Sequence, residues 1–115
     1  METTAYSILK IYASTTDRIG SKLLYEHLVE TAREKGISGV TVYRGVMGYG
    51  LSSEISTSRF WELTEKLPVM IEIIDQTQVL EEFFSLIETE LHSMPKGCLV
   101  LMQPVTVKMH KSGKK

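Results

Sequence analysis

Three glycines, Gly45, Gly48 and Gly50, follow directly on a run of alternating β-branched residues, and a hydroxyl-rich segment comes after them. A glycine at the end of a strand serves one of two physical purposes. It permits a positive φ, or it lets a ligand approach the backbone closely. The spacing therefore predicts either a ligand-binding loop base or a simple turn with a bulge, and both interpretations stay open at this level.

Cationic side chains stand at two further places where an anion could bind. Arg44 and Arg59 could each hold a phosphate through paired hydrogen bonds, although most arginines are surface residues. Lys96 precedes Gly97 in a short Pro-Lys-Gly run, so an ammonium group and a backbone N–H could converge there. The alternative for Lys96 is a lysine in a turn that ends a helix.

Metal chemistry and covalent catalysis find little support in the sequence. The three histidines, His27, His92 and His110, are spread over separate segments without metal-ligand spacing, so a metal site would need ligands from several subunits. The one cysteine, Cys98, begins an apolar run and is expected to be buried and inert. No catalytic triad, P-loop or dinucleotide fingerprint is present, and we expect no enzyme activity.

Length and composition predict one cytoplasmic domain spanning residues 1–115. The chain has 115 residues, 43% of them hydrophobic and 23% charged, with a formal net charge of −1. Such a charge gives no global field for nucleic acid, and the apolar runs are too short for membrane insertion. The N-terminus lacks the basic and apolar regions of a secretory signal.

Hydrophobic periodicity predicts four strands, at 6–13, 40–46, 68–75 and 98–102, and two helices, at 21–35 and 75–92. Ser21 is the expected N-cap of the first helix and Gly36 its left-handed C-cap. Asp75 with Gln78 suggests a capping box for the second helix. Pro104 indicates an edge strand or a bulge, because it cannot donate to a ladder.

This element order predicts an α+β, ferredoxin-like βαββαβ sandwich: a four-stranded antiparallel sheet with two helices on one face. The crossover rule places the first and third strands in the centre. Two helices cover only one face, yet the strands carry apolar residues on both. We therefore expect an oligomer whose sheets pack together. The segment 51–66 has no clear period, and it is predicted to be either a ligand-gated loop or a simple hairpin extension.

Several runs of residues in this sequence resemble those of a known family. The run Gly36-Ile37-Ser38-Gly39-Val40-Thr41-Val42, followed by Gly48-Tyr49-Gly50, is similar to the second strand and T-loop base of PII signalling proteins. The pattern around Asp17-Arg18, Val42-Tyr43-Arg44-Gly45 and Leu67-Pro68 is closer still to small, poorly characterised bacterial and archaeal PII-like proteins. The resemblance covers nearly the whole chain.

The resemblance implies a homotrimer that binds an adenine nucleotide between subunits. A T-loop-like segment at about 45–66 would then present itself to a partner such as a membrane transporter or an enzyme. The loop base of one subunit is expected beside a neighbour's 95–97 turn. The implied ligand-binding residues are Thr41, Arg44, Gly45, Gly48, Tyr49, Gly50, Lys96, Gly97, Lys108 and His110.

Departures from the PII pattern bear on the ligand. Only Pro95-Lys96-Gly97 stands where PII proteins have a longer phosphate-binding loop, and Lys108 and His110 fall near two PII arginines. A lysine and a mostly neutral histidine supply less fixed charge than two arginines, so AMP suits this sequence better than ATP, and ADP or ATP stay open as ligands. The alternatives are a metal-responsive trimer resembling cation-tolerance (CutA) proteins, an enzyme on the same scaffold, and a constitutively docked structural subunit.

Overall fold

The computed structural model describes residues 4–50, 56–57 and 66–114. Most of the predicted loop 51–66, including Arg59, lies outside these residues. The described chain contains two α-helices and eight strands, four of which are only two residues long. The elements are β1 (Tyr6–Ser14), β2 (Arg18–Ile19), β3 (Lys22–Leu23), α1 (Leu24–Glu34), β4 (Gly39–Arg44), β5 (Met47–Gly48), β6 (Ser56–Thr57), β7 (Pro68–Gln76), α2 (Thr77–Ser93) and β8 (Leu99–Val105).

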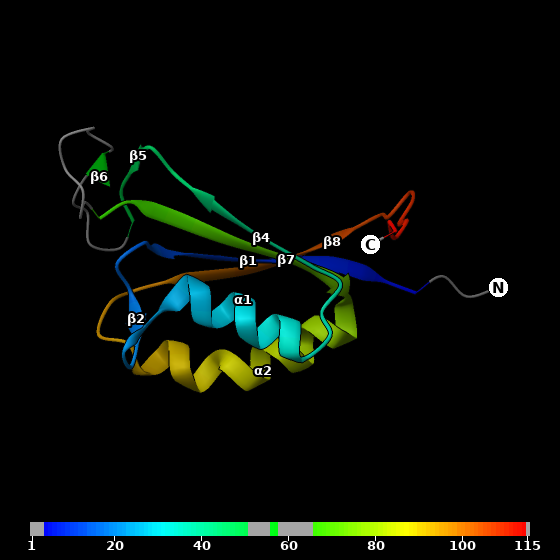
Figure 1. Ribbon diagram of the computed structural model, residues 1–115, viewed down its shortest axis with the longest axis horizontal. Helices are drawn as coiled ribbons and strands as arrows, with labels where there is room; N and C mark the ends of the chain where they lie inside the picture. Colours follow the sequence, from blue (N-terminus) through cyan, green and yellow to red (C-terminus); the bar gives the residue numbers. More distant parts are fainter. Residues whose placement is uncertain (1–3, 51–55, 58–65, 115) are drawn as a thin grey trace.

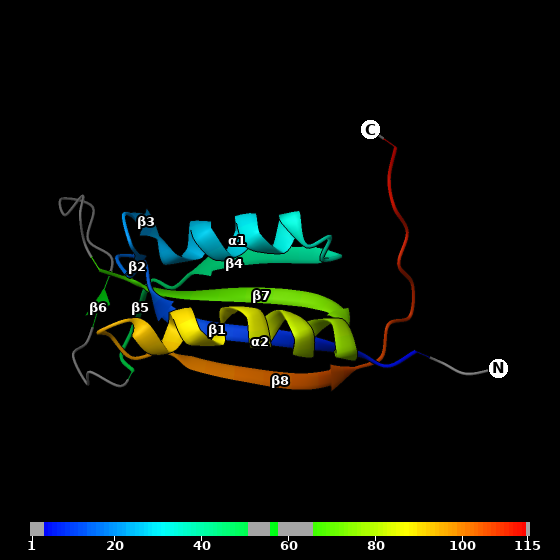
Figure 2. The same cartoon turned by 90° about the horizontal axis from the view of Figure 1, so that it is seen from below.

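The four long strands form one antiparallel sheet in the order β4-β7-β1-β8, and both helices lie on the same face of it (Figures 1 and 2). This confirms the predicted fold class and places the first and third long strands in the centre. The edge position of β8 explains how Pro104 is accommodated, because its missing N–H is tolerated there. In the part of the chain described, neither helix is long and apolar enough to cross a membrane.

The core lies between the helices and the sheet. Alternate residues of β1 and β7 point toward the helices, as the strand period of two requires. On the helix side, residues spaced three or four apart meet them. The buried apolar residues of this layer are Leu9, Ile11, Leu24, Leu28, Ala32, Val69, Ile71, Ile73, Leu80, Phe83, Ile87, Leu91 and Met94.

The predicted boundaries fail where local cues meet tertiary pairing. Gly20 has a φ of 62° and closes a hairpin between β2 and β3, so α1 begins at Leu24 and Ser21 is not its N-cap. The first helical N–H is instead bound by a carbonyl, since Leu24 N donates to Asp17 O at 2.8 Å. Gly36, with a φ of 73°, confirms the left-handed residue that ends this helix.

The second helix also starts later than predicted, at Thr77, and no side chain caps it. Strand β7 continues to Gln76, which pairs with Tyr6, and this long-range pairing overrides the capping-box pattern. Asp75 binds the backbone N–H groups of Ser38 and Gln76 instead.

Two of the predicted strands also have different ends. The second long strand, β4, ends at Arg44 and not at Val46. The last strand, β8, begins at Leu99 and continues through Pro104 to Val105, beyond the predicted end at Met102. Pairing with β1 as far as Tyr6 carries β8 past the point at which the apolar run stops.

The sheet face away from the helices carries exposed apolar side chains. Tyr12 and Leu99, which are paired in register, are 38% and 50% exposed. Leu101 and Tyr43 lie on the same face and are also exposed, while Lys10 and Glu72 sit opposite each other at its centre. Both faces of the sheet therefore carry apolar residues, as the sequence predicted, and the second face is interrupted by this charged pair.

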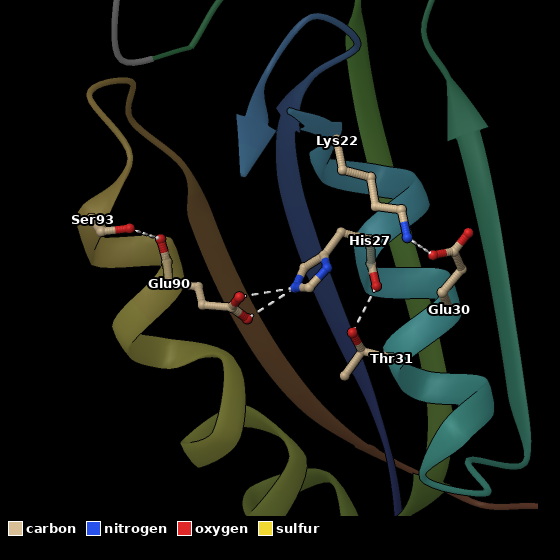
Figure 3. Close-up of polar contacts among 6 residues, drawn as sticks. All are labelled: Lys22, His27, Glu30, Thr31, Glu90 and Ser93. Atoms are coloured by element: carbon tan, nitrogen blue, oxygen red, sulfur yellow. Dashed lines mark hydrogen bonds and ion pairs between the residues drawn. The ribbon is translucent and has the colours of Figure 1, made fainter. Parts of the chain in front are cut away.

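The two helices are linked by His27 and Glu90, whose side chains point toward each other (Figure 3). The imidazole Nε2 of His27 lies 3.0 Å from the Glu90 carboxylate. Nearby, Lys22 pairs with Glu30 on the surface, and this hydrogen bond raises the pKa of Lys22. Exposed pairs of this kind contribute little to stability. The His27–Glu90 contact is partly buried and joins two separate elements, so it should contribute more.

We expect His27→Ala to lower the free energy of unfolding by about 1 kcal/mol, the usual net value of one such hydrogen bond. The matched control is His92→Ala on α2, because His92 is highly exposed and only 3.7 Å from Glu88 one turn away. Urea denaturation measures both variants. Equal stability of the two variants would show that the inter-helix contact contributes nothing.

Candidate functional site

A cavity of about 300 Å³ lies at the end of the sheet where β1 finishes and β7 and β8 begin. Because β1 is antiparallel to both β7 and β8, its last residues lie beside the first residues of those two strands, at the same end of the sheet. The turn before β8 and the segment after β5 complete the wall. The lining residues are Tyr12, Ala13, Ser14, Asp17, Gly48, Tyr49, Gly50, Lys66, Pro68, Val69, Lys96, Gly97, Cys98 and Leu99.

Backbone hydrogen bonds fix the two ends of the segment 45–67 beside this cavity. Gly45 N donates to Pro68 O at 2.8 Å. Thr15 N donates to Leu67 O at 2.9 Å, and Leu67 N donates back to Thr15 Oγ1 at 3.1 Å. Strand β5 then pairs with β6, with Gly48 opposite Ser56. The chain therefore leaves and re-enters the sheet at the mouth of the cavity.

Gly45 and Gly48 serve a packing purpose that the sequence did not reveal. Among the described glycines only Gly20 and Gly36 have positive φ, so Gly45, Gly48 and Gly50 are not required for backbone conformation. A Cβ on Gly45 would lie 3.3 Å from the Pro68 ring, and one on Gly48 would lie 3.2 Å from it. The close approach is made by the chain's own proline. Around Gly50 there is open space.

Five of the ten predicted site residues line this one cavity: Gly48, Tyr49, Gly50, Lys96 and Gly97. They come from two segments far apart in sequence that belong to the same chain. In this cavity Gly48, Tyr49 and Gly50 lie with the 95–97 turn of the same chain. The sequence led us to expect the 95–97 turn of a neighbouring subunit there. Gly45 packs against Pro68 in the same wall.

The other predicted residues lie elsewhere in the chain. Thr41 and Arg44 are exposed on β4, outside the cavity lining. Lys108 and His110 follow β8, at the opposite end of the sheet from β5 and β6 (Figures 1 and 2). Neither residue lines the cavity of its own chain.

Sequence reasoning missed the other nine lining residues, and the four of these with polar or reactive side chains of most interest are Tyr12, Asp17, Lys66 and Cys98. Tyr12 and Lys66 carried no local signal, since their position depends on strand pairing. Asp17 entered the sequence analysis only as part of the family resemblance and not as a site residue. Burial, and to a lesser extent the charge of Asp17, raises the pKa of the Cys98 thiol. Little thiolate is then present at neutral pH. Cys98 is only partly buried and lines the cavity, so its predicted burial is wrong.

The cavity combines aromatic, cationic and acidic groups. Tyr12 and Tyr49 offer flat faces on which a base can stack. Lys66 and Lys96 offer ammonium groups for a phosphate. Asp17 offers a hydrogen-bond acceptor. No cluster of three or more potential metal ligands occurs among the residues that the structure describes. The chemistry of this wall suits a small anionic molecule with an aromatic part.

The four-stranded sheet with two helices on one face makes this chain a ferredoxin-like α+β protein. The chain belongs to the DUF190 family, described as Uncharacterized ACR, COG1993, whose model matches residues 6–107. A UPF0166 protein of Aquifex aeolicus (strain VF5) is 37% identical over 76 residues, which cover 66% of this chain and 72% of that protein. A UPF0166 protein of Methanocaldococcus jannaschii is 35% identical over 90 residues, covering 78% of this chain and 79% of the relative.

Solved structures share the fold at low sequence identity. A PII-like signaling protein (TTHA0516) from Thermus thermophilus superposes with a TM-score of 0.62 at 16% identity, covering 91% of each chain. CPII from Thiomonas intermedia K12, bound to ADP, AMP and bicarbonate, gives 0.60 at 13% identity over 88% of each chain. The ion-tolerance protein CutA1 from Ehrlichia chaffeensis gives 0.57 at 12% identity, covering 94% of this chain and 88% of that one.

We expect Gly45→Ala to lower the free energy of unfolding by about 1 kcal/mol, because the added methyl must displace the Pro68 ring. Gly50→Ala is the matched control. It meets no atom within 4 Å and should leave stability unchanged or raise it by about 0.4 kcal/mol through the unfolded state. Chemical denaturation measures both. A Gly45 variant as stable as the Gly50 variant would contradict the packing explanation.

Proposed function

We propose that this chain is a PII-like signalling protein that binds an adenine nucleotide in the cavity at the end of the sheet. The observation that carries the proposal is the convergence of the glycine loop base, the 95–97 turn and two tyrosines around one cavity. The binding of ADP and AMP by CPII, a protein of the same fold, supports an adenine nucleotide as the ligand. Nucleotide binding would favour one conformation of the 51–66 segment over others, and a transporter or an enzyme would bind that conformation.

AMP is the favoured nucleotide in this proposal. The cavity holds two lysines, Lys66 and Lys96, and the buried carboxylate of Asp17 lines the same wall. This leaves a modest excess of positive charge, which matches a monophosphate better than a triphosphate. A neighbouring subunit would bring Arg44, Lys108 and His110 to the site. It describes a cytoplasmic regulator without catalytic activity of its own.

The helix-free face of the sheet supports the trimer. Its apolar side chains, Tyr12, Tyr43, Leu99 and Leu101, are each more than a third exposed in the single chain. A second copy packed there would remove them from water. The alternative function is that of a metal-responsive trimer, and CutA1 has the same fold. Among the described residues, no cluster of potential metal ligands favours this alternative.

Isothermal titration calorimetry with AMP, ADP, ATP and cyclic AMP tests the ligand. We expect AMP to bind and Lys96→Ala to weaken it about tenfold, the effect of losing one hydrogen bond to a charged group. Lys35→Ala is the control, because this lysine ends α1, outside the cavity lining. No heat with any of the four nucleotides at millimolar concentration would defeat the proposal. Unchanged AMP affinity in Lys96→Ala would remove that lysine from the site.

We expect Leu101→Asp to dissociate the trimer, because it places a charge on the helix-free sheet face. Leu86→Asp is the matched control: Leu86 is 48% exposed and Leu101 43%, but Leu86 lies on α2 in the helical layer. Light scattering coupled to gel filtration measures the mass of each. A wild-type monomer at micromolar concentration, or equal dissociation of both variants, would contradict the assignment of this face.

A further inference from the structure

Asp17 is the most deeply buried charged residue in the wall of the cavity. It lies in the loop between β1 and β2 and is only 5% exposed. Ser14 N donates to its Oδ2 at 2.9 Å. Its backbone is held as well, because its N–H donates to Ser14 O and its carbonyl accepts from Leu24 N. The fold therefore fixes the position of this carboxylate from two sides.

A comparison with Asp75 shows what Asp17 lacks. Asp75 is 6% exposed, and each of its carboxylate oxygens accepts a backbone N–H, from Gln76 at 2.6 Å and from Ser38 at 2.9 Å. For Asp17, no described residue donates to Oδ1, and none of the described ion pairs includes it. A buried carboxylate with one oxygen unmatched is costly unless a further donor reaches it.

Asp17 lies at the boundary between two cavities. Asp17 borders the main cavity and also a second one, of about 430 Å³, on the side of Arg18 and Pro95. Lys96 is the other residue that borders both. Asp17 and Lys96 thus share the boundary between the two cavities.

We infer that Asp17 accepts a hydrogen bond from a ribose hydroxyl of the nucleotide and makes the site select ribonucleotides. The inference rests on the proposed function. The position of Asp17 beside Lys96 places it near the phosphate end of the ligand. Tyr12 and Tyr49, whose rings line the main cavity, would hold the base. A carboxylate that binds ribose hydroxyls is a common solution in nucleotide sites.

The inference is tested by titrating the wild-type protein with AMP, 2′-deoxy-AMP and 3′-deoxy-AMP. We expect at least one deoxynucleotide to bind about tenfold more weakly than AMP, since a hydrogen bond to a charged acceptor is lost. In Asp17→Asn the amide can keep the Ser14 contact but turns an NH₂ group toward the ligand. AMP should then bind more weakly, and the difference between AMP and the deoxynucleotide should disappear.

Asp75→Asn is the control for a general effect on the fold. It alters an equally buried carboxylate outside the cavity lining, so it should lower stability and keep the preference for ribose. Equal binding of AMP and both deoxynucleotides by the wild type overturns the inference, even if Asp17→Asn does not fold. A preference for ribose that survives in Asp17→Asn also overturns it. So does a selectivity limited to AMP over inosine monophosphate, which would place the carboxylate at the base.

These outcomes separate the inference from the proposed function. Binding of AMP that depends on Lys96 but not on the ribose leaves the proposed function standing and removes only the role of Asp17. No binding of any nucleotide defeats both together.

Discussion

The number of helices is the constraint on which this structure depends. Two helices cover one face of a four-stranded sheet and no more. The buried apolar layer therefore lies entirely on that side, and it determines which residues of β1 and β7 point inward. The helices do not cover the opposite face of the sheet or the end of the sheet where β1 finishes and β7 and β8 begin, and both are therefore available for function. The exposed Tyr12 and the cavity beside it both follow from this one limit.

The sequence predicted the architecture well because the architecture follows from periodicity. Apolar alternation and helical stripes indicated the fold class and the strand order. The errors lie where strand pairing, local or distant, overrides a capping pattern. Ser21 looks like an N-cap, but the hairpin at Gly20 extends the chain past it. Asp75 looks like a capping residue, but the pairing of β7 with β1 continues to Gln76 and releases its side chain to bind Ser38 N.

The candidate site was predicted in part, and the reason for the glycines was not. Gly48, Gly50 and Lys96 were chosen from their types and spacing, and they do line one cavity. Yet a sequence shows no sign that Pro68, far along the chain, fills the space where a side chain of Gly45 or Gly48 would lie. A glycine that is needed for a positive φ and a glycine that is needed for close packing look the same in a sequence. Only the structure, through φ and contact distances, separates them.

The cavity and the helix-free face share residues, so ligand binding would be linked to assembly in the proposed trimer. Tyr12 and Leu99 lie opposite each other in the ladder, belong to the helix-free face, and line the cavity. A subunit packed on that face would cover both side chains and close one wall of the site. Because linkage is reciprocal, a ligand held better by the closed wall must also favour the assembled form. The strength of that coupling is limited by the difference in affinity between the open and the covered cavity, not by affinity itself.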